Sequence, residues 1–256
     1  MSGAYYNEFD PYAAQWLRNL IAAGHIAPGD VDERSIEDVH PDDLKHYTQC
    51  HFFAGIGVWS LALRRAGWPD DRPVWTGSCP CQPFSSAGEG AGFDDPRHLW
   101  PYWAWLIGER RPAVILGEQV ASKTVEPWID LVQADLEGMA YAFGAVAFPA
   151  AGVGAPHIRD RTYWMANSNS NGLKQQDSLL LSRRQGAASS NAARRMPWAD
   201  VEWIVCPDGK ERPRKPGVDL LADGHSFGLD QLRAYGNSLN AEAATQFIAA
   251  YLDATS

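Results

Sequence analysis

The chain has 256 residues, of which 45% are hydrophobic, and it carries a formal net charge of −9. This length allows one sizeable core and at most two domains. No run of about eighteen apolar residues is present, which excludes a membrane-spanning helix, and four cysteines without a disulfide framework fit a reducing cytoplasm.

The charge is unevenly distributed along the chain. Residues 1–157 hold 10 basic and 20 acidic side chains, residues 158–218 hold 11 basic and 6 acidic ones, and residues 219–256 hold 1 and 5. One basic segment in an otherwise acidic chain favours contact with phosphate on a single face. A solvated, arginine-rich loop is the alternative reading of the same composition.

Strand and helix patterns alternate over residues 3–166, which predicts an α/β fold with a parallel sheet. We expect strands at His51–Ala54, Pro73–Thr76, Ala113–Leu116 and Thr162–Ala166, and helices at Val58–Ala66, Leu99–Arg110 and Trp128–Ala142. Residues 167–200 have the composition of a loop. Beyond them, residues 201–214 predict a β-hairpin that turns at Asp208-Gly209, and Asn240–Leu252 predicts an amphipathic helix.

Residues 78–85 read Ser-Cys-Pro-Cys-Gln-Pro-Phe-Ser and follow a predicted strand. Cys81 lies between two prolines, in a stiff loop that can hold a thiol out for chemistry. Two thiols one residue apart, without a second Cys or His cluster, make a poor zinc site, so we expect no metal. The segment resembles the nucleophile loop of DNA cytosine-5 methyltransferases. This resemblance implies that Cys81 attacks C6 of a cytosine and that Gln82, Pro83 and Ser85 contact the substrate.

The segment His51–Gly57 is an apolar strand that runs into two glycines and then into a predicted helix. Glycines at such a place permit a tight turn and a close approach of the backbone to a ligand. Together with the cysteine loop, the segment resembles the Phe-x-Gly-x-Gly motif of the same family, which lines the pocket for S-adenosylmethionine (SAM). The resemblance implies cofactor contacts from Phe53, Gly55 and Gly57.

Only 24 positions separate Gly57 from Cys81, which is too short for the two further strand–helix units that the cofactor site needs. Two segments upstream resemble the missing motifs, namely Ala4–Trp16 for the second motif and Pro28–Asp32 for the third. We therefore expect a permuted methyltransferase with motifs in the order II, III, I, IV. The alternative is an unrelated N-terminal helix on a truncated enzyme.

Within these upstream segments, the resemblance implies roles for four residues. Glu8 is expected at the ribose hydroxyls and Phe9 beside the adenine ring. Asp30 is expected at the adenine amino group, with Val31 next to it. Near the C-terminus, residues 234–240 resemble the Gly-Asn-Ser motif, which implies that Asn237 and Ser238 lie against the SAM pocket.

Covalent attack on cytosine needs an activated thiolate and a group that handles charge at N3 and O2 of the ring. The predicted strand that ends in Glu118 resembles the family's Glu-Asn-Val motif, with Gln119 in place of asparagine. The resemblance implies that Glu118 hydrogen-bonds the N3 and N4 edge. We expect a raised pKa for this carboxyl, because it would lie against a base in a drying pocket.

Residues 154–166 resemble the family's Gln-x-Arg-x-Arg motif, with His157 in place of glutamine. Arg159 and Arg161 alternate on an extended run, which predicts that both face one side. Arg161 is expected at cytosine O2 and Arg159 at a phosphate. Arginine suits both tasks because it keeps its charge in a desolvated pocket.

The resemblance implies a Rossmann-like, class I SAM-dependent methyltransferase sheet with a small inserted target-recognition segment. Residues 1–166 would form the catalytic domain, residues 167–218 a basic target-recognition region, and residues 219–256 a segment that returns to the catalytic domain. The arginines expected to hold phosphates are Arg183, Arg184, Arg194 and Arg195.

The expected function is that of a solitary DNA (cytosine-5) methyltransferase, which transfers a methyl group from SAM to C5 of a flipped cytosine through a covalent Cys81 adduct. We expect a monomer in the cytoplasm of a bacterial or phage-infected cell, with DNA as its partner. Three alternatives remain open. They are a catalytically silent DNA-binding protein on the same scaffold, an enzyme that transfers a group other than methyl to cytosine C5, and an enzyme that acts on RNA.

Overall fold

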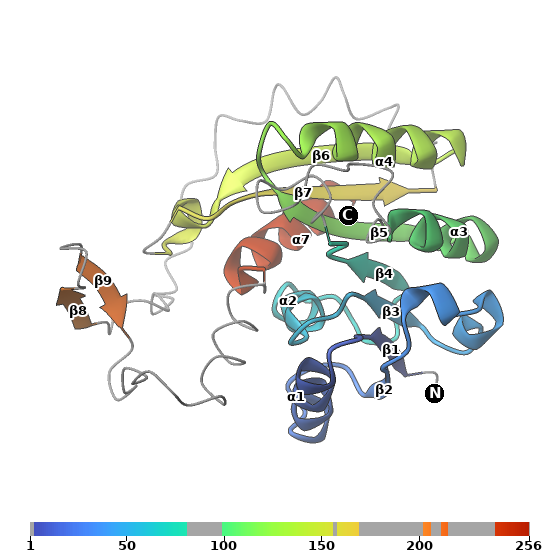
Figure 1. The fold of residues 1–256 in the computed structure, drawn as a ribbon, viewed down its shortest axis with the longest axis horizontal. Helices are drawn as coiled ribbons and strands as arrows, with labels where there is room; N and C mark the ends of the chain where they lie inside the picture. Colours follow the sequence, from blue (N-terminus) through green and yellow to red (C-terminus); the bar gives the residue numbers. More distant parts are fainter. Residues whose placement is uncertain are drawn as a thin grey trace.

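The computed structural model describes residues 3–80, 99–155, 158–168, 202–205, 211–214 and 239–255. Its centre is a seven-stranded sheet with the strand order β2-β1-β3-β4-β5-β7-β6 (Figure 1). The strands are β1 (Ala4–Asn7), β2 (Gly29–Asp32), β3 (Gln49–Phe52), β4 (Val74–Gly77), β5 (Val114–Val120), β6 (Ala142–Pro149) and β7 (Asp160–Asn167). Strands β1 to β5 are parallel, and β7 runs antiparallel to both β5 and β6.

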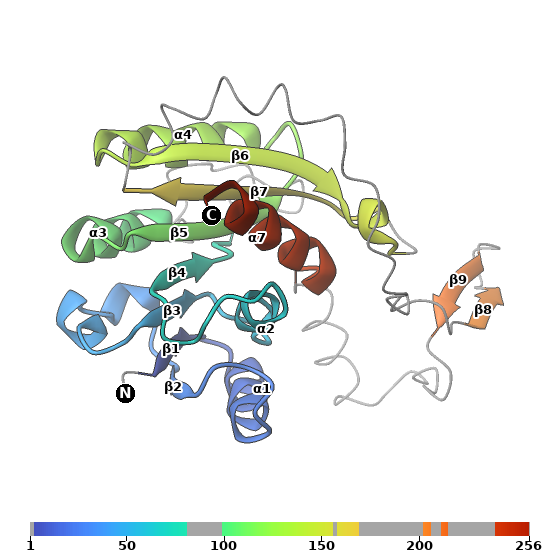
Figure 2. The same ribbon diagram turned by 180° about the vertical axis from the view of Figure 1, so that it is seen from behind.

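Helices cover both faces of this sheet (Figures 1 and 2). One face packs against α1 (Pro11–Ala22), α2 (Val58–Arg65) and α7 (Ala241–Thr255). The other face packs against α3 (Trp100–Arg110) and α4 (Glu126–Gly138), and against the short 3-10 helices η1 (Ile36–Asp38) and η2 (Pro41–Leu44). The predicted α/β class is therefore confirmed.

The C-terminal helix α7 returns to the sheet beside α2, although the two are far apart in sequence (Figure 2). Tyr251 of α7 stacks on Trp68, with ring centroids 5.9 Å apart, and Phe247 lies 5.5 Å from Tyr163 of β7. Asn240 caps the helix, since its side-chain oxygen accepts a hydrogen bond from the Ala243 amide. The predicted helix at 240–252 is confirmed and extends to Thr255.

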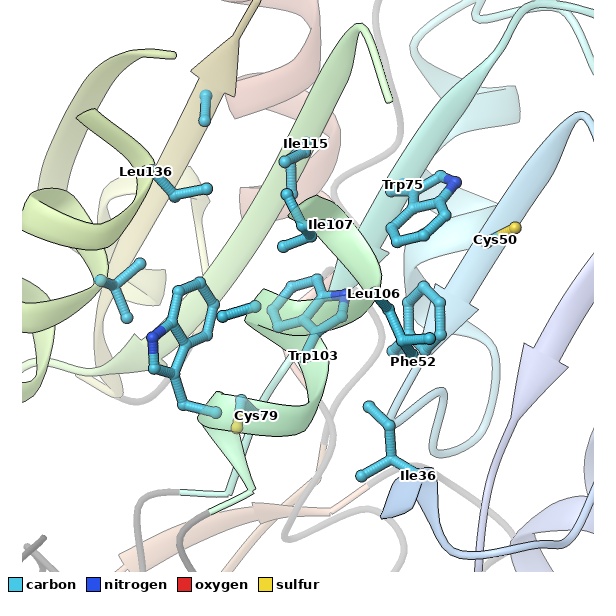
Figure 3. Packing of buried hydrophobic residues seen from close by; sticks show 14 of the residues in the cluster. Ile36, Cys50, Phe52, Trp75, Cys79, Trp103, Leu106, Ile107, Ile115 and Leu136 are labelled. Carbon is cyan, nitrogen blue, oxygen red and sulfur yellow. The ribbon is translucent and has the colours of Figure 1, made fainter. Parts of the chain in front are cut away.

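The core on the α3 and α4 face is rich in aromatic side chains (Figure 3). Phe52 lies between Trp75 and Trp103, at centroid distances of 4.9 and 5.8 Å. Trp103 and Trp164 are fully buried and contact each other at 5.7 Å. Aromatic contacts of this size dominate the burial energy of a core, so this cluster anchors the middle of the sheet.

Two glycines make room for these tryptophans. Gly77 of β4 lies opposite Gly117 of β5 in the parallel register. A Cβ atom would lie 2.5 Å from the Trp103 ring at Gly77 and 2.0 Å from the Trp164 ring at Gly117. No larger residue fits at either position without displacing an indole, so the two rings lie directly beneath the ends of β4 and β5.

Most predicted elements are confirmed, but the sheet is mixed, and the expectation of a parallel sheet was wrong at β6 and β7. Only residues 150–159 connect β6 to β7. A parallel return needs a crossover of about a dozen residues or more, whereas an antiparallel return does not. The short connection therefore forces β7 to run back along β6. The strand pairing of the hairpin predicted at 201–214 is confirmed, since β8 (Glu202–Val205) pairs antiparallel with β9 (Glu211–Arg214). Its predicted turn at Asp208-Gly209 lies outside the described residues.

The predicted helix Trp128–Ala142 was too long, and strand β6 was missed. Helix α4 ends at Gly138, and the backbone of Ala140 takes a left-handed φ of 62° before β6 begins at Ala142. Gly138 was the available stop signal, because glycine favours the end of a helix. The apolar run that follows cannot be told from helix by periodicity alone.

Over the part of the chain that the structure describes, no helix has the length and apolar character needed to cross a bilayer. The described residues also contain no group of three or more His, Cys, Asp or Glu side chains that could hold a metal ion.

Candidate functional site

Several of the predicted site residues that the structure describes lie at one edge of the sheet. Strands β1, β3, β4 and β5 are parallel, so their carboxyl ends meet there, and the antiparallel β7 begins at the same edge. This edge carries Glu8 after β1, the glycine turn after β3, and Glu118 at the end of β5. Cys81 lies outside the described residues, as do Gln82, Pro83 and Ser85, and the described chain reaches Pro80.

Glu8 binds the glycine turn that follows β3. One carboxylate oxygen accepts a hydrogen bond from the Gly55 amide at 2.6 Å, and the other accepts one from the Asp10 amide at 3.0 Å. Burial raises the pKa of Glu8, and the two backbone hydrogen bonds oppose that rise. The segment from β1 and the turn after β3 are thus joined directly, as the resemblance implies for the cofactor residues Glu8 and Gly55.

The two positions of the turn require glycine for different structural reasons. Both have left-handed backbones, with φ of 54° at Gly55 and 77° at Gly57. A Cβ at Gly57 would lie 3.0 Å from Leu17, so this glycine permits close packing of α1 on α2. A Cβ at Gly55 would meet no atom of the described residues within 4 Å, so these residues leave space beside the backbone. Gly55 therefore has the property expected of a ligand-binding turn.

The neighbouring aromatic residues also show features of a binding site. Phe53 has a φ of 50°, which is a strained value for a bulky residue, and such strain tends to occur at functional sites. Its ring lies edge-on to Trp103 at 6.1 Å. Phe9 is 73% exposed, which is unusual for a phenylalanine next to a buried strand, and its ring is available to a ligand.

Asp30 and Val31 line a cavity of about 400 Å³ beside β2. Within it, the Tyr47 hydroxyl donates a hydrogen bond to Asp30 at 2.8 Å, and the Tyr5 hydroxyl donates one to Asp32 at 2.7 Å. The walls of this cavity do not include Glu8 or Phe9. The predicted cofactor residues therefore form two groups on neighbouring strands, and Asn237 and Ser238 lie outside the described residues.

This donor set fits SAM. A carboxylate suits ribose hydroxyls, an exposed aromatic ring suits adenine, and a second carboxylate suits an amino group. Glu8, Phe9 and Asp30 supply these groups, and the open side of Gly55 allows a ligand to approach the backbone. Sequence reasoning missed Tyr47, whose hydroxyl holds Asp30 from the crossover between β2 and β3.

Glu118 is the buried acidic group beside the strand that leads into the cysteine loop. It is only 7% exposed and forms an ion pair with Arg161, whose Nε lies 2.7 Å from its Oε1. Burial raises the pKa of Glu118 above its usual range, while Arg161, Ser78 and Arg159 oppose the rise. The predicted raised pKa of this carboxyl is supported by its burial.

The prediction that Arg159 and Arg161 face one side because they alternate along an extended run was wrong. Strand β7 begins at Asp160, and Arg159 has a left-handed φ of 39°, so simple alternation along an extended run does not place it. Its charge still acts on Glu118 and on Arg161. Burial lowers the pKa of Arg159, although an arginine remains charged under all ordinary conditions.

Gln119 stands where the family pattern has asparagine, and its longer side chain has a structural use here. Its buried amide donates a hydrogen bond to the Cys79 carbonyl at 3.0 Å and accepts one from the Val120 amide at 2.9 Å. The side chain therefore connects the end of β5 to the backbone that leads into the cysteine loop.

Sequence reasoning also missed Ser78 and Trp59. The indole N–H of Trp59, in α2, donates a hydrogen bond to the Ser78 hydroxyl at 3.1 Å, and the Ser78 side chain lowers the pKa of Glu118. Ser78 directly precedes the cysteine loop, but its position beside Glu118 depends on how β4 pairs with β5. His157 and the four arginines Arg183, Arg184, Arg194 and Arg195 lie outside the described residues.

Known proteins resemble this chain over part of its length. A sequence model of the C-5 cytosine-specific DNA methylase family matches residues 68–197, which is about half of the chain. The type II methyltransferase M1.ScrFI of Lactococcus lactis subsp. cremoris is 36% identical over 97 residues, which cover 36% of this chain and 25% of that protein. The type II methyltransferase M.HhaI of Haemophilus parahaemolyticus is 30% identical over 103 residues, which cover 39% of this chain and 32% of that protein. The chain thus spans about a quarter to a third of these relatives.

Among solved structures, a Spodoptera frugiperda DNMT2 mutant is similar, with a TM-score of 0.45 and 18% identity over 65% of this chain and 42% of that one. The S. pombe Dnmt2 methyltransferase is similar with a TM-score of 0.39 and 18% identity, over 72% of this chain and 48% of that one.

Proposed function

Because the chain belongs to the C-5 cytosine-specific DNA methylase family, we propose that it methylates C5 of a cytosine flipped out of DNA, with SAM as methyl donor and Cys81 as nucleophile. The observation that carries the proposal is the buried Glu118, paired with Arg161 beside the strand end that leads into the cysteine loop. A carboxyl of raised pKa next to a fixed guanidinium is a donor pair suited to N3 and O2 of cytosine.

In the proposed reaction, the base leaves the stack because C5 and C6 are shielded inside the duplex. The Cys81 thiolate forms a bond to C6, while protonated Glu118 donates to N3 and Arg161 donates to O2, so the charge that develops on the ring is neutralised. C5 then gains the methyl group and loses its proton to a base, and the bond between C6 and sulfur breaks. Bound SAM supplies the methyl group as an electrophile.

The Glu118–Arg161 ion pair has a second consequence for this reaction. While the pair stands, each group satisfies the other, which avoids an unpaired charge in a buried place. An incoming cytosine offers N3 to the carboxyl and O2 to the guanidinium. The base therefore replaces each partner without leaving either group unsatisfied.

The test is mass spectrometry of nucleosides from unmethylated DNA incubated with the protein and SAM. We expect 5-methylcytosine with the wild-type protein and none with Cys81→Ala as control. The same assay with RNA in place of DNA shows which of the two nucleic acids the protein methylates. The absence of 5-methylcytosine from every DNA sample, the wild-type reaction included, would overturn the proposal.

We also propose that the chain is permuted relative to the family's usual motif order. The first two strands carry Glu8 and Asp30 and lie beyond β3 in the sheet, so that the chain reaches the glycine turn only afterwards. The hydrogen bond between Glu8 and the Gly55 amide supports this order, because it joins the second motif to the first across neighbouring strands. Ligand groups converge at the carboxyl ends of strands whatever the order of the chain.

Glu8→Ala is expected to weaken SAM binding about 30-fold, because hydrogen bonds to a charged group contribute about 2 kcal/mol. Isothermal titration calorimetry measures the dissociation constant directly. Glu137→Ala is the matched control, since Glu137 is an exposed glutamate of α4 whose side chain hydrogen-bonds Gln133 on the same helix. Equal SAM affinity in Glu8→Ala and the control would show that Glu8 is not a cofactor residue.

The proposed organisation has residues 1–166 as the catalytic domain, 167–218 as the target-recognition region and 219–256 as a returning segment. The return of α7 to α2 supports the last of these. In this proposal, the basic region holds DNA phosphates through Arg183, Arg184, Arg194 and Arg195, which would give affinity with little sequence information. We propose a monomer that acts in the cytoplasm of a bacterial or phage-infected cell.

A further inference from the structure

A hydrogen bond from α2 reaches the serine that lies beside Glu118. Trp59 is 2% exposed, and its indole N–H donates to the Ser78 hydroxyl at 3.1 Å. An indole nitrogen can only donate, so Ser78 must act as the acceptor in this bond. Its single hydroxyl proton then remains available for another group.

That group is the Glu118 carboxylate. Gly77 lies opposite Gly117 in the parallel register of β4 and β5, so the following residues, Ser78 and Glu118, are neighbours at the carboxyl ends of the two strands. From this position the Ser78 side chain lowers the pKa of Glu118, against the effect of burial. Because the indole occupies the acceptor side of the hydroxyl, the Ser78 proton is directed to the carboxylate.

We propose that Ser78, held in place by Trp59, is a positioning residue that orients the Glu118 carboxyl toward the target base. This inference rests on the proposed function, because it assigns a second residue to the same chemical group. Ser78 does not touch the base in this proposal and acts only through Glu118. Trp59 keeps Ser78 in its working rotamer.

The protonation of Glu118 depends on every group that faces it. Arg161 pairs with it from β7, Arg159 acts on it from the residue before β7, and Tyr163 lies opposite it in the register of β5 and β7. Burial raises the pKa of Glu118 and outweighs the two arginines and Ser78. Since a hydrogen bond to the charged form lowers a pKa, the loss of Ser78 would raise the pKa of Glu118 further.

Ser78→Ala is expected to lower kcat about tenfold without changing the KM for SAM, because the Glu118 carboxyl loses the hydrogen bond proposed to orient it toward the base. The alkaline limb of the pH–rate profile should move to higher pH, because the carboxyl keeps its proton longer. Ser78→Thr retains a hydroxyl and should return kcat to within about threefold of wild type. If threonine is no better than alanine, or if the alanine variant keeps the wild-type profile, Ser78 is not a positioning residue.

Two further variants separate positioning from loss of structure. The ring of Trp59 lies 6.3 Å from that of Tyr163. Trp59→Phe keeps an aromatic ring there but removes the indole N–H, so it should also move the alkaline limb to higher pH. Ser60→Ala is the matched control on the same helix. Its buried hydroxyl contacts Tyr6 and the Ala27 amide, so its loss should lower the melting temperature and leave the limb in place. A limb that moves with Ser60→Ala would overturn the inference.

A readout without turnover keeps this inference distinct from the proposed function. In protein labelled with ¹³C at glutamate Cδ, an NMR titration follows the Glu118 carboxyl, which Glu118→Gln assigns. A higher pKa of Glu118 in Ser78→Ala than in wild type supports the inference even if the wild type forms no 5-methylcytosine. An unchanged pKa overturns it even if the wild type is active.

Discussion

Glu118→Gln is expected to lower the rate of cytosine methylation about a thousandfold, in the middle of the range for loss of a general acid. Glutamine keeps the shape and can still donate a hydrogen bond, but it cannot release a proton to N3. The carboxyl it replaces is buried, has a raised pKa and is paired with Arg161. The measurement is single-turnover kinetics with hemimethylated or unmethylated DNA, which isolates chemistry from product release.

Two observations accompany this rate. SAM affinity should remain within about twofold of wild type, because Glu118 is not among the groups proposed to hold the cofactor. Glu126→Gln is the matched control, since Glu126 is an exposed glutamate at the start of α4. A Glu118→Gln rate within about tenfold of the control would remove the proposed role from this carboxyl.

The pH dependence follows from the same group. Because the acid form of Glu118 is the active one and its pKa is raised, the wild-type rate should fall as pH rises through that pKa. The thiol must lose its proton to react, so Cys81 should produce the opposite limb on the acid side. The Glu118→Gln variant should lose the alkaline limb and keep the acid one.

Gly117→Ala is expected to destabilise the fold by about 3 kcal/mol, at the upper end of the usual cost of overpacking a core. The added Cβ would lie 2.0 Å from Trp164, which is fully buried and packs against Trp100 and Trp103. The indole cannot move aside without disturbing the cluster. Urea denaturation should show a lower midpoint with an unchanged slope.

Gly144→Ala is the control within the same sheet. A Cβ at Gly144 of β6 meets no atom of the described residues within 4 Å, and the substitution should change the free energy of unfolding by less than about 0.5 kcal/mol. Trp164→Phe removes the ring atoms nearest to the new methyl group. The double variant Gly117→Ala/Trp164→Phe should therefore be more stable than the sum of the two single changes predicts, and strict additivity would contradict the steric reason.

The segments that the sequence predicted well are those with strong local signals. The strands that became β3, β4, β5 and β7 are short apolar runs bounded by turn residues, and the C-terminal helix has a clear apolar face. Glu118 and the glycine turn after β3 were also identified in advance, because Glu118 lies near the carboxyl end of such a strand and the glycine turn directly follows another. Strand β6 was missed because its apolar run carries no periodicity that distinguishes it from a helix.

The sequence by itself determined which side chains are available, namely a thiol between two prolines, a carboxylate at the end of a strand, and arginines two positions apart. The tertiary structure alone decided which of them meet. The Glu118–Arg161 ion pair requires that β7 run antiparallel beside β5, and the placement of Ser78 against Trp59 and beside Glu118 requires that β4 pair with β5 beneath α2. Such contacts join residues 19 to 43 positions apart, and local propensity extends over only a few residues. They are set by strand register and by the close packing of Gly77 and Gly117 on two tryptophans.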